Sequence, residues 1–252
     1  MIQDIKAIDM HNHINSGTIY DEDECEAVRY ELGYVKDVMI GANIEKTFCS
    51  TYASVKATNI IEQENELMKS LCAENDFLYQ WVVIDPRVDS TFVQAREILE
   101  TKKCVGIKLH PLYHEYTLDE YGDKVFAFAS EYSAIVLIHP ERVATHILPM
   151  ADKYPDVKFI MAHLNGNPDD HIAAVKLAKN GNVYTDTATA GSIRNRSIEY
   201  AVSQIGSERI LFGTDTYAAG FQRGRIEYAL ISEEDKANIL RYNAERLFVN
   251  KI

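Results

Sequence analysis

Residues 134–163 read AIVLIHPERVATHILPMADKYPDVKFIMAH, and this stretch decides the fold class. It begins and ends with short apolar runs, Ala134–His139 and Val157–His163, each of strand length. Between them, Val143–Lys153 carries apolar residues at intervals of three and four, which is typical of a helix that packs on a sheet. A strand, a helix and a second strand in this order form the β-α-β unit of a parallel sheet.

The same alternation continues along the rest of the chain. Near-continuous apolar runs, typical of strands buried on both faces, predict eight strands: Ile5–His11, Lys46–Thr51, Phe77–Asp85, Cys104–His110, Ala134–His139, Val157–His163, Val183–Thr187 and Arg209–Gly213. Helical patterns lie at Ile60–Glu74, Phe92–Thr101, Lys124–Tyr132, Val143–Lys153, Ile172–Lys179 and Glu233–Phe248. We expect Ser232 to cap the last of these helices.

Eight strands separated by helices predict a single (β/α)8 barrel over residues 1–252, regular or distorted. The alternative is an open, doubly wound sheet. It is disfavoured because no Gly-x-Gly-x-x-Gly turn follows the first strand, and because eight strands suit closure.

Charge and composition restrict the classes of partner. The 252 residues include 26 basic and 38 acidic side chains, for a net charge of -12, which repels phosphate backbones and anionic lipids. Nucleic acid and membrane partners are therefore not expected, and no signal-like segment or apolar run of about 20 residues is present. The four cysteines form no CxxC pair, which indicates reduced thiols in a cytoplasmic protein. We expect a small-molecule substrate, and assembly into a homo-oligomer is compatible with the sequence.

The positions of the histidines give the strongest functional signal. Five of the eight stand at or just past the carboxyl ends of predicted strands, where barrel enzymes build their active sites: His11, His13, His110, His139 and His163. His11 and His13 are two residues apart, so on a strand both imidazoles share a face and can bind one divalent ion. Asp215 ends the eighth strand, where a carboxylate can bind a metal and accept a proton from metal-bound water.

These motifs, in this order, resemble the amidohydrolase superfamily, and in particular its amidohydrolase-related (amidohydrolase 2) branch. The matching elements are His11-x-His13, GIKLHP at 106–111, His139, Ala162-His163, Gly213-Thr214-Asp215, YPDVKF at 154–159 and ILRYNAERLF at 239–248. The resemblance spans essentially the whole chain. It implies a barrel enzyme with a divalent metal, usually zinc, that acts on small carboxylated, cyclic or amide-containing compounds.

By position, the resemblance implies His11, His13, His139 and Asp215 as the metal ligands. It implies His163 as a further ligand or as the residue that positions the nucleophile or the substrate. In some binuclear members a lysine on the fourth strand is carbamylated and bridges two metals. Lys108 occupies that strand; pairing with a buried acid or binding a substrate carboxylate is the favoured alternative.

Other candidates rest on the residues alone. His110 shares a strand face with Lys108 and is a candidate substrate contact or supplementary ligand. Arg87 follows the third strand and can bind a substrate carboxylate with both arms of its guanidinium, a role also open to Arg142. Asp186 closes the seventh strand, where it can orient a neighbouring ligand or cap a helix.

Two enzymatic functions follow. The first is a metal-dependent hydrolase of a small carboxylated ester, lactone or amide, in which Asp215 takes a proton from metal-bound water and the metal or His163 polarises the carbonyl. The alternative is a metal-dependent, non-oxidative decarboxylase of an aromatic or unsaturated carboxylic acid, in which a general acid protonates the carbon that loses carbon dioxide. A purely structural metal site is disfavoured, because such sites are closed by four ligands, often cysteines.

Overall fold

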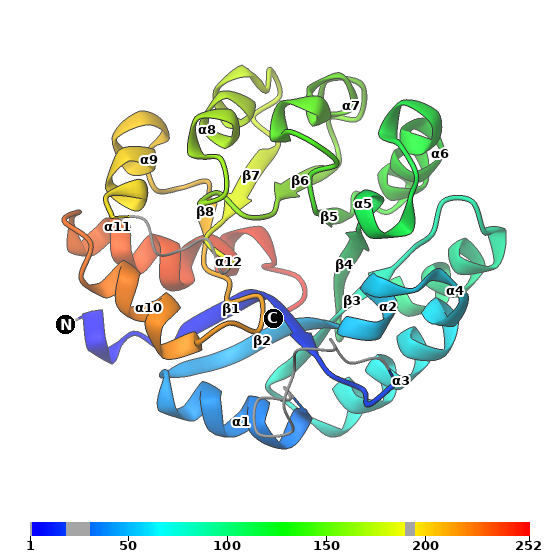
Figure 1. The fold of residues 1–252 in the computed structure, drawn as a ribbon, viewed down its shortest axis with the longest axis horizontal. Helices are drawn as coiled ribbons and strands as arrows, with labels where there is room; N and C mark the ends of the chain where they lie inside the picture. The colour runs from blue at the N-terminus through cyan, green and yellow to red at the C-terminus, as the bar shows by residue number, and fades with distance from the viewer. Residues whose placement is uncertain (1, 19–30, 190–194) are drawn as a thin grey trace.

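A computed structural model describes residues 2–18, 31–189 and 195–252. Eight strands pair in parallel and in chain order: β1 (Ala7–Ile14), β2 (Ile44–Thr51), β3 (Leu78–Val83), β4 (Cys104–Leu109), β5 (Ile135–Ile138), β6 (Lys158–Met161), β7 (Val183–Asp186) and β8 (Ile210–Leu211). Figure 1 shows these strands at the centre of the molecule with the helices around them. The prediction of a (β/α)8 barrel is confirmed.

Backbone hydrogen bonds connect the last strand to the first. The N–H of Met10 donates to the carbonyl of Phe212 at 3.0 Å, and the N–H groups of Thr214 and Asp215 donate to the carbonyl of His11 at 3.1 and 2.8 Å. β8 is only two residues long and pairs with β7 over both of them. The barrel is therefore distorted around β8, next to the seam between β8 and β1. Because the seam bonds join residues 214 and 215 to His11, barrel closure also positions two predicted metal ligands side by side.

Most helices lie where the periodicity places them. The helical elements are η1 (Ile2–Asp4), α1 (Leu32–Gly41), α2 (Tyr52–Lys56), η3 (Thr58–Ile60), α3 (Ile61–Glu74), α4 (Asp89–Leu99), α5 (Pro111–His114), α6 (Leu118–Glu131), η4 (Ala144–Ile147), α7 (Leu148–Lys153), α8 (Pro168–Leu177), α9 (Ser197–Ile205), α10 (Ala219–Glu227), α11 (Glu233–Ala237), η6 (Asn238–Tyr242) and α12 (Asn243–Leu247). The last predicted helix is one helical run with a π-helical turn, η6, inside it. Its cap is confirmed, since the Ser232 hydroxyl accepts the N–H of Asp235 at 3.1 Å.

The barrel interior is apolar at its amino-terminal end. Phe248, which follows α12, packs edge-on against Phe48 and Trp81, with ring centroids 5.0 and 5.7 Å apart. The Trp81 indole also donates to the carbonyl of Met10 at 2.8 Å. Gly106 on β4 permits this packing, because a Cβ there would lie 2.7 Å from the Trp81 ring and 2.2 Å from the carbonyl oxygen of Ile135. The polar side chains are therefore gathered at the other end of the barrel.

Cys49, Cys72 and Cys104 are buried free thiols, and Cys25 lies outside the described residues. In the described part of the chain, no helix combines the length and the apolar character that a membrane span requires.

Candidate metal and active site

The carboxyl ends of the strands surround a cavity of about 220 Å³. Seven of the side chains predicted for the site line it. The complete lining is His11, His13, Tyr52, Val55, Lys108, His110, Tyr113, His139, His163, Thr189, Asp215, Thr216 and Tyr217. The structure therefore brings together residues from β1 and from the ends of β4, β5, β6 and β8, as the strand-end argument predicts.

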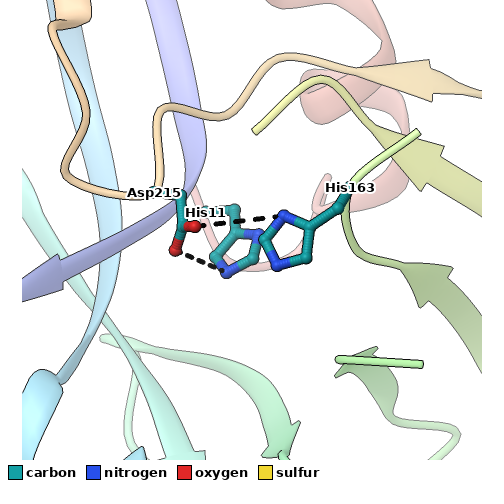
Figure 2. Close-up of side chains that lie close together, drawn as sticks. All are labelled: His11, His163 and Asp215. Carbon is teal, nitrogen blue, oxygen red and sulfur yellow. Dashed lines mark ion pairs between the residues drawn. The ribbon is translucent and has the colours of Figure 1, made fainter. Parts of the chain in front are cut away.

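Three of these side chains form a compact group of metal-binding atoms. His11, His163 and Asp215 each offer one ligand atom, and the three atoms lie within 4.8 Å of one another. Figure 2 shows the Asp215 carboxylate turned toward both imidazoles; its oxygens lie 3.6 Å from His11 Nε2 and 3.9 Å from His163 Nδ1. His13 joins this group, because its Nε2 lies 3.3 Å from Asp215 Oδ1.

Hydrogen bonds fix which nitrogen of each imidazole is free. His11 Nδ1 donates to Asp186 Oδ2 at 2.8 Å, and the Nδ1 atoms of His139 and His163 donate to backbone carbonyl oxygens at 3.0 Å. Each ring therefore keeps an unprotonated Nε2. An outer oxygen acceptor that orients an imidazole in this way is typical of metal-binding histidines. Asp186 thus lies where the sequence suggested that it could orient a ligand.

This donor set fits a divalent metal. Imidazole nitrogen and carboxylate oxygen are ligands that zinc, manganese and iron accept. Burial lowers the pKa of His11 and His13 and lowers that of His139 to about 3, so these rings stay neutral and able to bind a metal at neutral pH. Burial would raise the pKa of Asp215, but the hydrogen bond with His13 and the surrounding imidazoles hold it well below its usual range. The carboxylate is therefore ionised.

Lys108 lies deep in the same cavity. Its Nζ is 3.0 Å from His11 Nε2, and no carboxylate of the described residues lies within ion-pair distance of it. Burial lowers the pKa of the ammonium to about 8, an effect that Asp215 and Asp186 partly offset. The sequence favoured pairing with a buried acid or binding of a substrate carboxylate. The structure places Lys108 against an imidazole of the predicted metal site, and the binding of a substrate carboxylate stays a prediction.

His110 is held as a hydrogen-bond donor. Its Nδ1 accepts the backbone N–H of Tyr113 at 3.2 Å at the start of α5, so the proton of the neutral ring is on Nε2. Burial keeps the pKa of His110 far below its usual range, so the ring is neutral. The ring stacks between Tyr113 and His139, with centroids 4.2 Å away on each side. This stack fixes the orientation of a donor in the cavity wall.

The backbone at His163 and at Asp215 is strained. His163 has a φ of 76° and Asp215 a φ of 55°, a left-handed region that non-glycine residues rarely adopt. The N–H of His163 donates to Asp186 Oδ1 at 2.9 Å, and the seam bond to His11 holds Asp215. Such strain is typical of functional sites, where the surrounding structure holds a side chain in one direction.

Arg87, a predicted substrate contact, does not line the cavity. Its guanidinium forms two hydrogen bonds with the carboxylate of Asp85, at 2.9 and 2.8 Å, and its backbone N–H donates to the same carboxylate at 3.0 Å. The arginine is therefore bound to an acid two residues earlier in the chain.

Some residues of the site carried no signal in the sequence. Tyr52 and Val55 come from the short helix α2, and Ser50 on β2 lies 3.0 Å from His13 Nδ1. Asp9 joins β1 to the β8 end, because it accepts the hydroxyl of Thr214 at 2.6 Å and its N–H at 3.1 Å. These contacts join segments that are far apart in the sequence, so no local sequence pattern predicts them.

Comparisons with known proteins agree with this architecture. Among solved structures, a 2,6-dihydroxybenzoate decarboxylase in complex with 2,6-dihydroxybenzoate has a TM-score of 0.78 at 19% identity, covering 96% of this chain and 99% of the other. The 5-carboxyvanillate decarboxylase from Sphingomonas paucimobilis has a TM-score of 0.74 at 14% identity, with 97% and 99% covered. A dihydroxybenzoic acid decarboxylase from Polaromonas sp. JS666, with bound manganese and 2-nitroresorcinol, has a TM-score of 0.74 at 18% identity, with 96% of each chain covered.

At these identities the likeness to solved structures shows the fold. No curated protein matches the sequence. A family model described as amidohydrolase matches residues 8–249, nearly the whole chain. The chain is therefore a member of the amidohydrolase family and an enzyme of the amidohydrolase superfamily.

Proposed function

We propose that this protein is a metal-dependent, non-oxidative decarboxylase of a small aromatic carboxylic acid. The observation that carries the proposal is the content of one small cavity, in which a metal-binding group lies beside a fixed donor, His110 Nε2–H. At about 220 Å³ the cavity is below the usual 300–1,000 Å³ of drug-sized pockets, which suits a single-ring acid. The decarboxylases reported above share the fold over nearly their full length, which supports this choice.

In this proposal His11, His13, His139 and Asp215 hold one divalent ion, zinc or manganese, with His163 beside them. The Polaromonas structure contains manganese, and a set of three imidazoles and one carboxylate accepts either ion. When bound, the ion would hold the oxygens of the substrate and withdraw charge from its ring. Elemental analysis of the purified protein, followed by reconstitution of the metal-free protein with each ion, identifies the metal.

The side chains of the cavity divide the remaining work. Decarboxylation breaks the bond between the ring carbon and the carboxylate, releases carbon dioxide and places a proton on that carbon. We assign this proton to His163, whose Nε2 would take up a proton from water before each turnover while its Nδ1–H donates to the carbonyl of Ala188 at 3.0 Å. The ionised Asp215, 3.9 Å away, stabilises the imidazolium. His110 Nε2–H binds an oxygen substituent of the ring.

Deuterium labelling tests the proposal. The metal-loaded protein is incubated in D₂O with 2,6-dihydroxybenzoate and other hydroxybenzoates, and the products are analysed by mass spectrometry. We expect carbon dioxide release and one deuterium at the carbon that carried the carboxylate. His163→Ala should lower the rate by about 10²–10⁴-fold. The matched control is His146→Ala, an exposed histidine of η4, which should not change the rate.

Hydrolysis is the second candidate, and one feature of the site favours it. The ionised Asp215 carboxylate lies against His13 and His163, where it could accept a proton from water. A panel of small lactones, esters and amides in ¹⁸O-water separates the two reactions. Label in the product acid, without carbon dioxide release from any aromatic acid, would replace the decarboxylase with a hydrolase.

A further inference from the structure

A second cavity, of about 350 Å³, adjoins the metal-binding cavity. The two share His139, His163 and Thr189 in their walls. The second cavity continues from these residues along the loop after β5 and over the start of α8. A ligand held at the metal-binding side chains therefore lies next to this second space, with His139 and His163 in the wall between them.

Arg142 is the only arginine or lysine among the described residues that line this second cavity. It stands three residues after His139, and its guanidinium forms no ion pair with a carboxylate of the described residues. The acid in the same wall, Asp170, is already occupied. It accepts the backbone N–H groups of Ala144 and Thr145, and the Thr145 hydroxyl at 2.7 Å. The charge of Arg142 is thus available to a ligand.

The remaining walls combine apolar residues with the polar side chains of Asn167 and Thr189, and they contain one buried acceptor. The hydroxyl of Thr185 donates to the carbonyl of Met161 at 3.0 Å, so it must accept Nδ1–H of His171, 2.8 Å away. The Nε2 of His171, a side chain that is 3% exposed and lines the cavity, is then left as a hydrogen-bond acceptor. The apolar part of the wall comes from Pro140, Val143, Ala144 and Ala162. The cavity therefore offers a guanidinium, an imidazole acceptor and apolar surface.

We propose that this second cavity is a subsite in which Arg142 binds an anionic substituent of the substrate. The preferred substrates are then single-ring aromatic acids that carry a second carboxylate, or a group of similar charge, away from the one that reacts. A planar guanidinium binds a carboxylate through two parallel hydrogen bonds, a geometry that lysine cannot reproduce. The inference rests on the proposed function, because that function places the reacting carboxylate in the first cavity.

Calorimetric titration of the manganese-loaded protein tests the subsite without turnover. The probes are benzoate and isophthalate, which differ by one carboxylate. We expect the wild-type protein to bind isophthalate about tenfold more tightly than benzoate, and Arg142→Gln to remove this preference while benzoate affinity stays within about twofold. Arg142→Lys, which keeps the charge but loses the fork, should recover part of the preference.

The matched control is Arg96→Gln, an exposed arginine of α4 that pairs with Glu131 on the outside of the barrel and should bind both probes like wild type. Two results would overturn the subsite: isophthalate affinity unchanged in Arg142→Gln, or no preference in the wild-type protein. Carbon dioxide release is measured separately on hydroxybenzoates. Loss of the isophthalate preference in a protein that releases no carbon dioxide would reject the proposed reaction but keep the subsite.

Discussion

The two ends of the barrel hold cavities of opposite character. The amino-terminal end has the larger one, about 690 Å³, lined by Val105, Ile135, Leu247, Phe248 and charged side chains at the edge of the barrel. The carboxyl-terminal end has only about 220 Å³, yet it contains buried imidazoles, a buried ammonium and an ionised carboxylate. Burying ionisable groups lowers the stability of the folded protein. A cluster of such groups in one cavity therefore indicates a functional site. Cavity size is therefore a poorer guide to chemistry than the groups in the wall.

The largest effect should follow removal of both histidines of β1. His11→Ala with His13→Ala should abolish metal binding and activity while the fold is kept, because the apolar packing around Phe248 lies at the other end of the barrel. Elemental analysis gives the metal content and circular dichroism the fold. Full metal content in the double variant would show that the ligands lie elsewhere.

Asp215→Asn should have the next largest effect. The variant keeps an oxygen of similar position but loses the negative charge that faces His13 and His163. We expect the rate to fall by about 10²–10⁴-fold, with a smaller loss of metal affinity because the imidazoles remain. The rate is measured at saturating metal. An unchanged rate would remove Asp215 from the proton transfer.

Phe248→Ala tests the opposite end of the barrel. The side chain is 1% exposed and packs on Phe48 and Trp81, so its removal should cost about 3–5 kcal/mol of unfolding free energy. Turnover of the folded fraction should change little. The adjacent Val249→Ala, at an exposed position, is the control and should leave stability within about 0.5 kcal/mol. A large loss of turnover in Phe248→Ala, with stability preserved, would contradict the division between the two ends.

The buried histidines of the carboxyl-terminal end should also make stability depend on pH. Burial lowers the pKa of His171 from 6.5 to about 4. Between these values the unfolded chain binds a proton that the folded chain does not, so stability is lost as the pH falls from about 6.5 toward 4. Urea unfolding of the metal-free protein at pH 7 and 4.5 should show His171→Gln losing about 2 kcal/mol less than wild type. His146→Gln, at an exposed site, should lose as much as wild type.

The strands were predictable because both faces of each are buried, which leaves apolar runs. The first strand was predicted to end at His11, yet β1 continues to Ile14. Asn12 and His13 are buried although they are polar, so the apolar run does not mark the end of this strand. Helices α1, α2, α5, α9 and α10 were not predicted. Helices α2 and α5 are very short, and α10 carries two glycines and little apolar periodicity.

The part of the site that comes from the ends of strands could be predicted from the sequence. Side chains at the carboxyl ends of parallel strands must converge, so residues 100 positions apart could be grouped without a structure. Arg87 shows the limit of this argument. It follows a strand like the others, but it pairs with Asp85, a local contact that residue types alone do not distinguish from a substrate site.

The smallest predicted effect is a loss of metal affinity on substitution of Asp186, and Asp85 is the matched control. Both are buried acids near strand ends, but Asp186 accepts Nδ1–H of His11 whereas Asp85 binds Arg87. In Asp186→Asn the amide nitrogen can donate to His11 Nδ1, which would move the ring proton to Nε2 and block metal binding there. We expect metal affinity to fall by about 10–100-fold, measured by competition with a chelator. Asp85→Asn should leave metal affinity unchanged, because its partner lies outside the cavity. Equal metal affinity in Asp186→Asn and wild type would mean that His11 is oriented by its own packing, and that the carboxylate only holds the backbone of His163.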